Sequence, residues 1–351
     1  MMNNGLPLDA SAWLQEAIAA GVPVRPLLLR LLTADDTESL LALQSAADRI
    51  RRQTVGDQIQ VRGIIEFSNH CRRNCIYCGI NCHNQRLPRY RLTPETIFET
   101  AEAAADLGID TIILQSGEDP YYTADLLAGI VRAVKQLGVA VTLSVGERPP
   151  NEYALWRKAG ADRYLLKFET SRPELYARLH PGFTLAQRLL SLDQLAALGY
   201  QVGSGTMIGL PGQTAPDLVD DLLLMQHKQL AMLGIGPFLP HPDTPLGNVP
   251  AGSITTCLRV IALARLLLPT AHIPATTALA AGAGDARPAA LAGGANVLMV
   301  TITPREYQQL YAIYPNRQRA LPAPQELRQA VEPLARRAAR LPTSEEERRE
   351  S

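Results

Sequence analysis

The sequence has little of what marks a membrane, secreted or nucleic-acid-binding protein. No stretch approaches the roughly 18 uninterrupted apolar residues that a membrane-spanning helix needs. The first residues lack a basic segment followed by an apolar one, so no signal peptide is evident. Basic and acidic residues number 34 each, and this balance predicts no attraction to nucleic acid or to an anionic membrane surface. We therefore expect a cytoplasmic protein that binds neither nucleic acid nor a membrane.

Cysteine is also scarce, but its placement is uneven. Four of the five cysteines, Cys71, Cys75, Cys78 and Cys82, lie close together in one short stretch. Cytoplasmic thiols stay reduced, so clustered cysteines bind metal more often than each other. A structural zinc site usually needs a second, separated pair; none is present, and Cys257 lies in an apolar helical run that predicts a buried thiol. An iron–sulfur cluster, which a compact loop can surround, fits better than zinc.

Short β-rich runs alternate with helix-period segments from about Ile59 onward. Eight runs can be counted: QVRGIIEFSN, TIILQSG, VAVTLSVG, DRYLLKFET, QVGSGTMIG, MLGIGPFLP, HIPATTA and NVLMVTIT. Glycines that are typical of helix C-caps precede several of them: Gly108, Gly138, Gly160 and Gly199. This alternation predicts an α/β protein, a (β/α)8 TIM barrel over residues 57–315, with a doubly wound open sheet as the alternative.

Helical segments flank the predicted barrel on both sides. Residues 1–56 are predicted to form a helical extension, from the segments DASAWLQEAIAAG and TADDTESLLALQSAADRIRRQTVG. Residues 316–351 are predicted to form one helix, APQELRQAVEPLARRAARL, followed by a frayed and highly charged tail. Neither flank carries an obvious chemical group.

Polar residues and glycines gather directly after the predicted strands. In a TIM barrel these positions share one mouth, where active sites are built. We therefore expect the site to include residues from this set: Ser68, Ser116, Gly117, Glu118, Ser144, Glu169, Met207, His241, Thr276 and Thr277.

The spacing of Cys71, Cys75, Tyr77 and Cys78 resembles the Cys-x3-Cys-x-aromatic-Cys motif of the radical S-adenosylmethionine (SAM) superfamily. The resemblance implies one [4Fe-4S] cluster held by Cys71, Cys75 and Cys78, with SAM on the remaining iron. It further implies reductive cleavage of SAM to a 5′-deoxyadenosyl radical. Cys82 lies outside the motif, and a fourth thiolate would occupy the position that SAM needs. We therefore interpret Cys82 as an incidental or redox-sensitive thiol.

Other stretches are similar to the SAM-binding parts of the superfamily. The turn QSGED follows the second strand, and GSGTMIGLPGQT resembles the glycine-containing fifth strand that passes close to adenine. Without the resemblance, Glu169 is as readily a structural carboxylate, and Arg188 is more readily a solvated helix residue. With it, the SAM-binding residues are predicted to be Tyr77, Ser116, Gly117, Glu118, Glu169, Arg188 and Met207.

Longer stretches resemble the [FeFe]-hydrogenase maturases of the HydE type, a family related to biotin synthase and methylornithine synthase. CRRNCIYCG, TIILQSGEDPYY and GIGPFLPHPDTPL are among them, and the likeness covers about residues 61–315. It implies assembly of the hydrogenase di-iron subsite from a small-molecule or organometallic substrate, with sister maturases and a low-potential electron donor as partners. It also implies a cavity lined by Gln115, Thr142, Arg163, Thr276, Thr277 and Tyr311.

Three features depart from that family. Lys167-Phe168-Glu169-Thr170 replaces a usual Arg-His-Glu-Thr, which we interpret as a change next to the cavity from a polar residue to Phe168. Cys82 is additional, and the C-terminal tail has no cysteines for a second cluster. Two alternatives therefore remain open. One is a radical SAM enzyme acting on an amino acid or a thioether precursor, and the other is an iron–sulfur or zinc protein without turnover.

Overall fold

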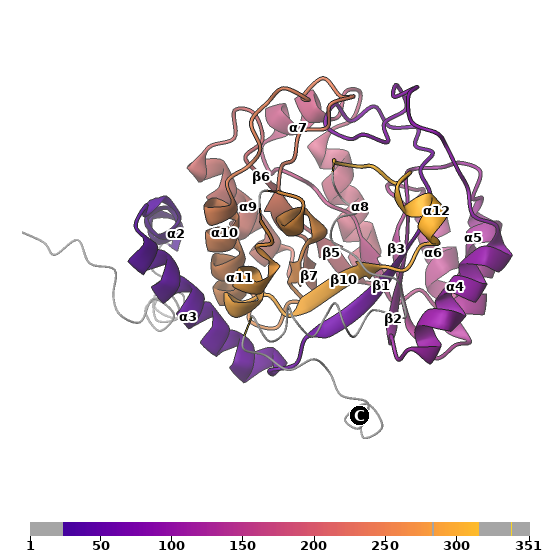
Figure 1. Ribbon diagram of the computed structural model, residues 1–351, viewed down its shortest axis with the longest axis horizontal. Coiled ribbons are helices and arrows are strands. Elements are labelled where there is room, and N and C mark those ends of the chain that lie inside the picture. Colours follow the sequence, from indigo (N-terminus) through magenta and orange to yellow (C-terminus); the bar gives the residue numbers. More distant parts are fainter. Residues whose placement is uncertain (1–23, 283, 316–337, 339–351) are drawn as a thin grey trace, which may run out of the picture.

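The computed structural model describes residues 24–282, 284–315 and 338 of the chain. Eight parallel strands form the centre of the molecule (Figure 1). Their hydrogen-bonded order is β7-β5-β4-β3-β2-β1-β10-β9. The two outer strands meet through a parallel bridge between Met232 and His272, which brings the sheet round into a barrel. The predicted TIM barrel is thus confirmed, and the open sheet is wrong. The strands are β1 (Gln60–Ser68), β2 (Thr111–Ser116), β3 (Ala140–Ser144), β4 (Arg163–Leu165), β5 (Gln201–Ser204), β7 (Met232–Leu233), β9 (Pro274–Ala275) and β10 (Val297–Thr301).

A separate pair of short strands, β6 (Met207–Ile208) and β8 (Gly236–Pro237), continues from β5 and β7 beyond the barrel wall. Both the fifth and the sixth predicted strands therefore correspond to two observed pieces. The break in the fifth strand lies at Gly205, where a Cβ atom would be 2.2 Å from the carbonyl oxygen of Gly234. Only glycine allows the two chains to approach this closely.

Helices surround the barrel, and their ends follow local sequence signals. The side chains of Thr93, Thr123, Thr184, Thr214 and Ser253 each accept a hydrogen bond from the backbone of the helix that follows. The four glycines predicted to end helices all have positive φ. The helices are α4 (Pro94–Asp106), α5 (Ala124–Lys135), α6 (Pro150–Ala159), α7 (Pro173–Leu179), α8 (Leu185–Ala197), α9 (Ala215–His227), α10 (Ile254–Leu267), η1 (Thr277–Ala280), α11 (Arg287–Ala292) and α12 (Arg305–Gln308).

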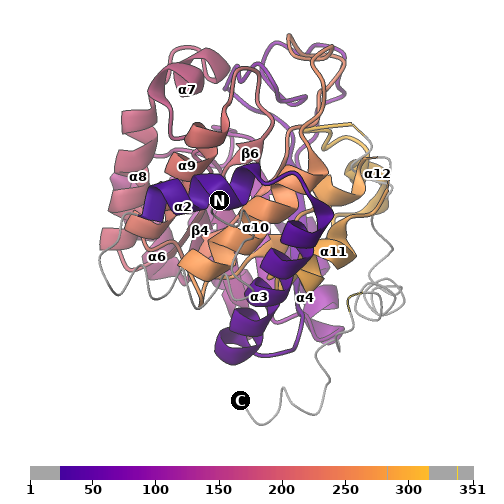
Figure 2. The same cartoon turned by 90° about the vertical axis from the view of Figure 1, so that its left-hand side faces the viewer.

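Two further helices, α2 (Val24–Thr33) and α3 (Thr37–Val55), lie across the outside of α9 and α10 (Figure 2). They cover the outer side of α10, which explains why this helix is apolar almost all round and why Cys257 is fully buried. The segment predicted as the second helix forms α3, whereas α2 was not predicted separately. The first predicted helix and the C-terminal one lie outside the described residues, except for Ala338.

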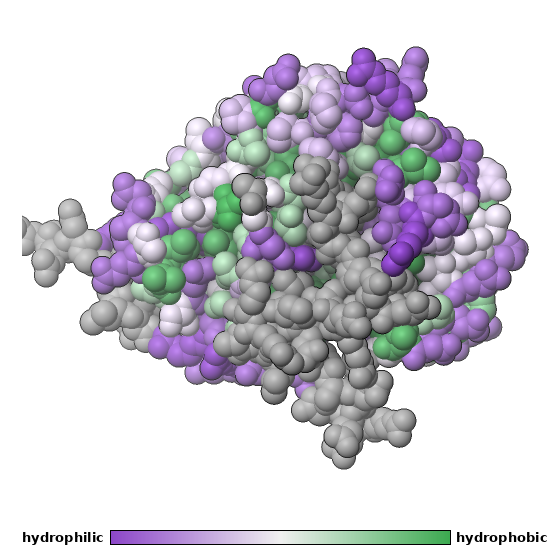
Figure 3. Space-filling view, viewed as in Figure 1, coloured by the Kyte–Doolittle hydropathy of each residue, from purple (hydrophilic) through white to green (hydrophobic). Residues whose placement is uncertain are grey.

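The apolar side chains are mostly inside the molecule. Leu165, Ile64, Ile113, Val297 and Met299 fill the middle of the barrel, and a larger core lies between the strands and the helices. The described surface on the face in Figure 3 is largely hydrophilic, with small hydrophobic patches. Within the described part of the chain, no helix combines the length and the hydropathy that crossing a bilayer requires.

Arg265 provides a test of how the last strands are held. This fully buried guanidinium donates to the carbonyl oxygens of Pro269 (2.7 Å) and Gly294 (2.8 Å) and to Oδ1 of Asn296 (2.9 Å). Arg265→Met leaves three acceptors, two of them buried, short of a donor, so we expect the free energy of unfolding to fall by roughly 3 kcal/mol. Denaturant unfolding measures this change. Arg132→Met, at an exposed position of α5, is the control and should change the free energy by less than about 0.5 kcal/mol; equal losses in both variants would contradict the assignment.

Candidate functional site

A cavity of about 340 Å³ opens at the mouth of the barrel, between the strand ends and the loop that carries the cysteines. Its floor is apolar, formed by Ile64, Leu165 and Met299. Its rim is made of sulfur, carboxylate, guanidinium and hydroxyl groups. Most of the side chains predicted for the site lie around it: Cys71, Cys75, Tyr77, Cys78, Gln115, Ser116, Gly117, Glu118, Glu169, Arg188, Met207, Thr276, Thr277 and Tyr311.

The cysteine loop, residues 69–92, is organised by one guanidinium. Arg89 donates to the carbonyl oxygens of four residues spread along the loop, Asn69, Ile80, Asn81 and Asn84. These carbonyl groups belong to no helix or strand, and the arginine supplies donors that the backbone does not. The loop therefore has a defined conformation although it has almost no regular structure.

The loop also packs directly against the end of β2. The backbone N–H groups of Arg73 and Glu118 both lie 3.4 Å from Sγ of Cys71 and donate to it. A Cβ atom on Gly117 would lie 2.3 Å from the carbonyl oxygen of His70, so a side chain at residue 117 would push the loop away. The glycine of the QSGED turn is thus required by the approach of two backbones.

The chemistry of the three lining thiols suits an iron–sulfur cluster. Burial raises the pKa of Cys75 to about 12, and the neighbouring Cys71 adds to the shift. The pKa values of Cys71 and Cys78 are raised as well, chiefly by burial. Thiolates in such a place need a positively charged partner, and the N–H groups on Cys71 are of the kind that surround cluster sulfurs.

Nothing in the described residues brings three His, Cys, Asp or Glu side chains together tightly enough for one metal ion. A cubane spreads its ligands over separate iron atoms, whereas one zinc ion draws them together, so the arrangement suits a cluster. Cys82 is exposed and does not line the cavity. Its backbone N–H donates to the carbonyl oxygen of Arg73 at 2.8 Å.

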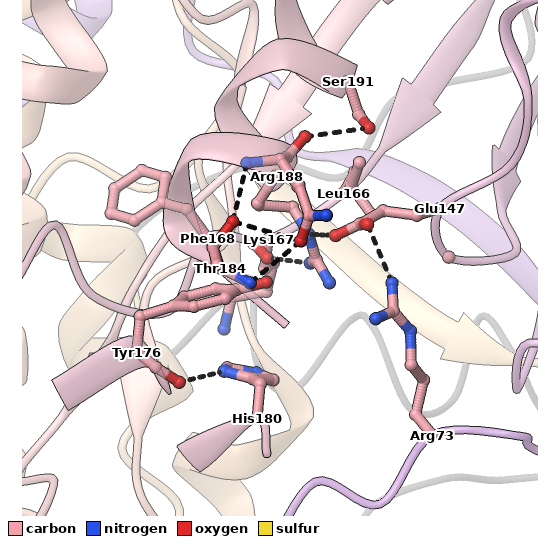
Figure 4. Close-up of polar contacts among 12 residues, drawn as sticks. Arg73, Glu147, Leu166, Lys167, Phe168, Tyr176, His180, Thr184, Arg188 and Ser191 are labelled. Carbon is pink, nitrogen blue, oxygen red and sulfur yellow. Dashed lines mark hydrogen bonds and ion pairs between the residues drawn. The ribbon is translucent and has the colours of Figure 1, made fainter. Parts of the chain in front are cut away.

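Four charges of alternating sign lie beside the cavity; Glu118, Arg73 and Arg188 are buried and Glu147 is partly buried. Figure 4 shows three of them, Arg73, Glu147 and Arg188. Arg73 lies between two carboxylates, with Nε 2.7 Å from Glu118 and Nη2 2.9 Å from Glu147. Glu147 in turn accepts from Nε of Arg188. We call Glu118, Arg73, Glu147 and Arg188 the charge chain; it joins the end of β2, the cysteine loop, the segment after β3 and helix α8.

The pKa shifts follow from these contacts. Burial alone would raise the pKa of Glu147, but Arg188 and Arg73 outweigh it and hold that pKa below its ordinary value. Burial likewise opposes the charge on both arginines, and the neighbouring groups, the carboxylates of Glu118 and Glu147 foremost for Arg73, raise their pKa values. Glu147, Arg73 and Arg188 therefore stay charged at neutral pH.

Arg188 occupies the position predicted for it, but most of its guanidinium already has partners. Nε binds Glu147, and Nη1 donates to the carbonyl oxygen of Lys167. The third nitrogen of the guanidinium, Nη2, has no hydrogen bond to any described residue. Arg188 also lines the cavity. One donor of the buried arginine thus remains for a ligand.

The segment after β4 corrects the interpretation of Phe168. Its ring is fully buried in the core outside the barrel and does not line the cavity. Lys167 does, and its Nζ lies 2.9 Å from Oε2 of Glu169. Beyond the end of β4 at Leu165, the chain places Leu166, Lys167 and Glu169 along the cavity, while the ring of Phe168 packs in the core between strands and helices. Of the residues in Lys167-Phe168-Glu169-Thr170 that differ from the usual Arg-His-Glu-Thr, the one that lines the cavity is therefore Lys167.

Tyr77, predicted from the cysteine motif, is held by a histidine that the sequence analysis passed over. Its hydroxyl lies 3.0 Å from Nε2 of His180, and His180 stacks on Tyr176 with ring centroids 4.1 Å apart. Burial lowers the pKa of His180 to about 3, with Arg188 adding to the shift, so the ring is neutral. No local pattern signals this contact, because His180 and Tyr77 lie far apart in the sequence.

The residues predicted for the substrate end divide into two groups. Gln115, Thr276, Thr277 and Tyr311 line the cavity, and Nε2 of Gln115 lies 3.3 Å from the hydroxyl of Tyr311. Thr142 and Arg163 lie outside the lining.

These two residues face each other in the register of β3 and β4. Arg163 is the first residue of β4, and its Nε donates to Oε1 of Gln201 at 2.7 Å. It lies at the end of the barrel opposite the mouth, which explains its distance from the site.

Comparisons with known proteins agree with this geometry. The family model described as "Radical SAM superfamily" matches residues 65–225. The chain is 51% identical over 293 residues to the "[FeFe] hydrogenase maturase subunit HydE" of Thermotoga maritima, covering 84% of each chain. It is 32% identical over 252 residues to 3-methylornithine synthase of Methanosarcina acetivorans, covering 71% of each. The solved structure of methylornithine synthase (PylB) superimposes with a TM-score of 0.82 at 28% identity, over 96% of this chain and 99% of that one.

Glu147→Gln tests the charge chain. The variant leaves Arg73 and Arg188 facing a neutral amide, so we expect the free energy of unfolding at neutral pH to fall by roughly 3 kcal/mol. Because the pKa of Glu147 is depressed in the folded protein, its stabilisation is present above the ordinary value of 4.5 and is lost as the pH falls below it. Denaturant unfolding at several pH values should show a constant difference from the wild type near neutrality and a shrinking one in acid.

Glu152→Gln is the matched control, because the side chain of Glu152 is about as exposed as that of Glu147 but pairs with one arginine, Arg148, at a single contact. Its expected effect is less than about 1 kcal/mol. Equal destabilisation by the two substitutions would show that the charge chain has no special weight.

Proposed function

The chain belongs to the radical SAM superfamily, within the family of the HydE maturase subunit, and on this premise we propose that Cys71, Cys75 and Cys78 hold its [4Fe-4S] cluster. The protein is an enzyme that uses this cluster and SAM. The observation that carries the proposal is the gathering of the three thiols on the rim of one cavity, while Cys82 lies outside it. When bound, the cluster supplies the electron that cleaves SAM to a 5′-deoxyadenosyl radical and methionine.

The protein's own residues bind and orient SAM in this scheme. We assign Tyr77, Ser116, Gly117, Glu118, Glu169, Arg188 and Met207 to its site, since all of them line the cavity. The free Nη2 of Arg188 supplies a donor for the SAM carboxylate. Because Arg73 and Arg72 already bind the carboxylate of Glu118, the backbone of the 116–118 turn is the better acceptor for the SAM ammonium group.

The substrate end of the cavity is polar but carries few charges. Gln115, Thr276, Thr277 and Tyr311 offer amide and hydroxyl groups above the apolar floor, and the hydroxyls of Thr277 and Tyr314 contact each other. Such a lining can orient a small polar or organometallic molecule by hydrogen bonds while excluding bulk water. Lys167 lines the same cavity and pairs with Glu169.

We infer that the enzyme acts in assembly of the di-iron subsite of [FeFe]-hydrogenase, in the cytoplasm, with sister maturases and a low-potential electron donor. Identity of 51% across 84% of both chains to the HydE subunit supports this role. A second candidate is a radical reaction on a small amino acid. The close superposition on methylornithine synthase over nearly the whole of both chains favours it.

Anaerobic cluster reconstitution tests the cysteine assignment. After reduction with dithionite in the presence of SAM, the wild type should release 5′-deoxyadenosine and methionine, detected by chromatography. Cys75→Ala should bind less iron and lose the reaction, because one ligand of the cluster is gone. Cys82→Ala, the matched control in the same loop, should keep both. Loss of the cluster in Cys82→Ala, or no product from the fully loaded wild type, would refute the assignment.

In vitro maturation distinguishes the two candidate functions. Apo-[FeFe]-hydrogenase incubated with the sister maturases and the wild-type enzyme should gain hydrogen-evolving activity, measured by gas chromatography. Omission of the enzyme, or its replacement by Cys75→Ala, should leave the hydrogenase inactive. If the enzyme cleaves SAM but never activates the hydrogenase, whereas a basic amino acid such as lysine stimulates the cleavage, the second candidate holds instead.

A further inference from the structure

Asp221 is a fully buried carboxylic acid that no cation accompanies among the described residues. It lies on α9, outside the cavity lining. Asp217, one turn earlier on the same helix, pairs with Arg172 at 2.8 Å instead. A buried acid without a charged partner is costly, so its hydrogen bonds need an explanation.

Both oxygens of Asp221 bind segments that lead into the site. Oδ1 accepts from the backbone N–H of Ser171 at 2.5 Å, and Oδ2 lies 2.6 Å from Oγ1 of Thr206. Oγ1 of Thr206 is in turn 2.7 Å from the carbonyl oxygen of Glu169. The next residue after Thr206, Met207, donates its N–H to the same carbonyl oxygen at 3.2 Å. Asp221 therefore reaches the backbone on which two cavity residues stand.

The hydroxyl of Thr206 has one hydrogen and cannot donate to two acceptors. Both contacts are satisfied when Asp221 carries a proton on Oδ2. The acid then donates to Thr206, and Thr206 donates to the carbonyl group of Glu169. Burial favours this protonated form and raises the pKa of Asp221 to about 6, although hydrogen bonds that Ser171 and Thr206 donate to the ionised carboxylate oppose the shift.

Glu169 needs such support, because its φ of 63° lies in the left-handed region that non-glycine residues seldom adopt. A conformation of this kind persists only where its surroundings enforce it. Its N–H donates to the carbonyl oxygen of Gly205 at 3.0 Å, and its own carbonyl group is the acceptor from Thr206 and Met207. The strained turn aims the carboxylate of Glu169 at the cavity.

We propose that Asp221 is a positioning residue for the SAM site, which fixes Glu169 and Met207 through a hydrogen-bond relay from its carboxylic acid by way of Thr206. The inference rests on the proposed function of these two residues as SAM contacts. Asp221 itself does not line the cavity. It acts on the site through the backbone of Ser171 and through Thr206.

Substitutions at Asp221 separate the relay from simple packing. An amide can accept from Ser171 through Oδ1 and donate to Thr206 through Nδ2, so Asp221→Asn should keep the wild-type dissociation constant for SAM. Asp221→Ala removes both contacts and should raise that constant about tenfold. Calorimetry on cluster-loaded protein without reductant measures it at about pH 5.5, below the pKa of Asp221 of about 6. Asp220→Ala, at the exposed neighbour that pairs with Arg25, is the matched control and should change nothing.

Hydrogen exchange gives a readout that depends on neither cluster nor activity. In cluster-free protein, the amides of Ser171 and Met207 should exchange at least tenfold faster in Asp221→Ala than in the wild type, and at the wild-type rate in Asp221→Asn. Thr206→Val, which keeps the volume and removes the hydroxyl, replaces Asp221→Ala if that variant does not fold, and should likewise speed exchange at Met207.

The results separate failure of this proposal from failure of the proposed function. Unchanged exchange and unchanged SAM binding in Asp221→Ala would overturn the positioning role. Losses in Asp221→Asn as large as those in Asp221→Ala would overturn the relay. If the wild type does not bind SAM but the exchange rates change as expected, the relay stands and the assignment of the cavity to SAM falls.

Discussion

The structure of the site depends on the charge chain of Glu118, Arg73, Glu147 and Arg188. Each member comes from a different part of the barrel mouth; Glu118, Arg73 and Arg188 are buried, and Glu147 is partly buried. Removing charges from water is unfavourable, so such a chain is stable only when every group has its opposite neighbour in place. It thereby fixes the cysteine loop relative to the strand ends, and the geometry of the cavity follows from that.

Much of the fold could be predicted because its signals are local. Strand periodicity, threonine caps and glycine stops each involve residues close in sequence, and the eight predicted strands all exist. The partners of Arg73 and Tyr77, which are Glu147 and His180, could not be found this way, since each pair is brought together only by the closing of the barrel. Phe168 is a different case. Strict alternation along DRYLLKFET would have turned it outward and Lys167 inward.

The two ends of the cavity have different characters. The end near the cysteines is crowded with charges that bind one another, and this leaves little freedom for change. The opposite end presents hydroxyl and amide groups over an apolar floor, where single replacements alter shape without leaving a buried charge unpaired. A barrel of this kind can keep one ligand constant while the second varies, which is how HydE and methylornithine synthase can both be relatives of the chain.

The hydrogen bonds of Arg89 also bear on how the cysteine loop takes up its cluster. All four of its hydrogen bonds to the loop are to backbone carbonyl oxygens, so they join parts of the chain to each other and do not involve iron or sulfide. Part of the entropy cost of ordering the loop is therefore offset by hydrogen bonds within the chain itself, and less of that cost has to be offset by the bonds between the cysteines and iron.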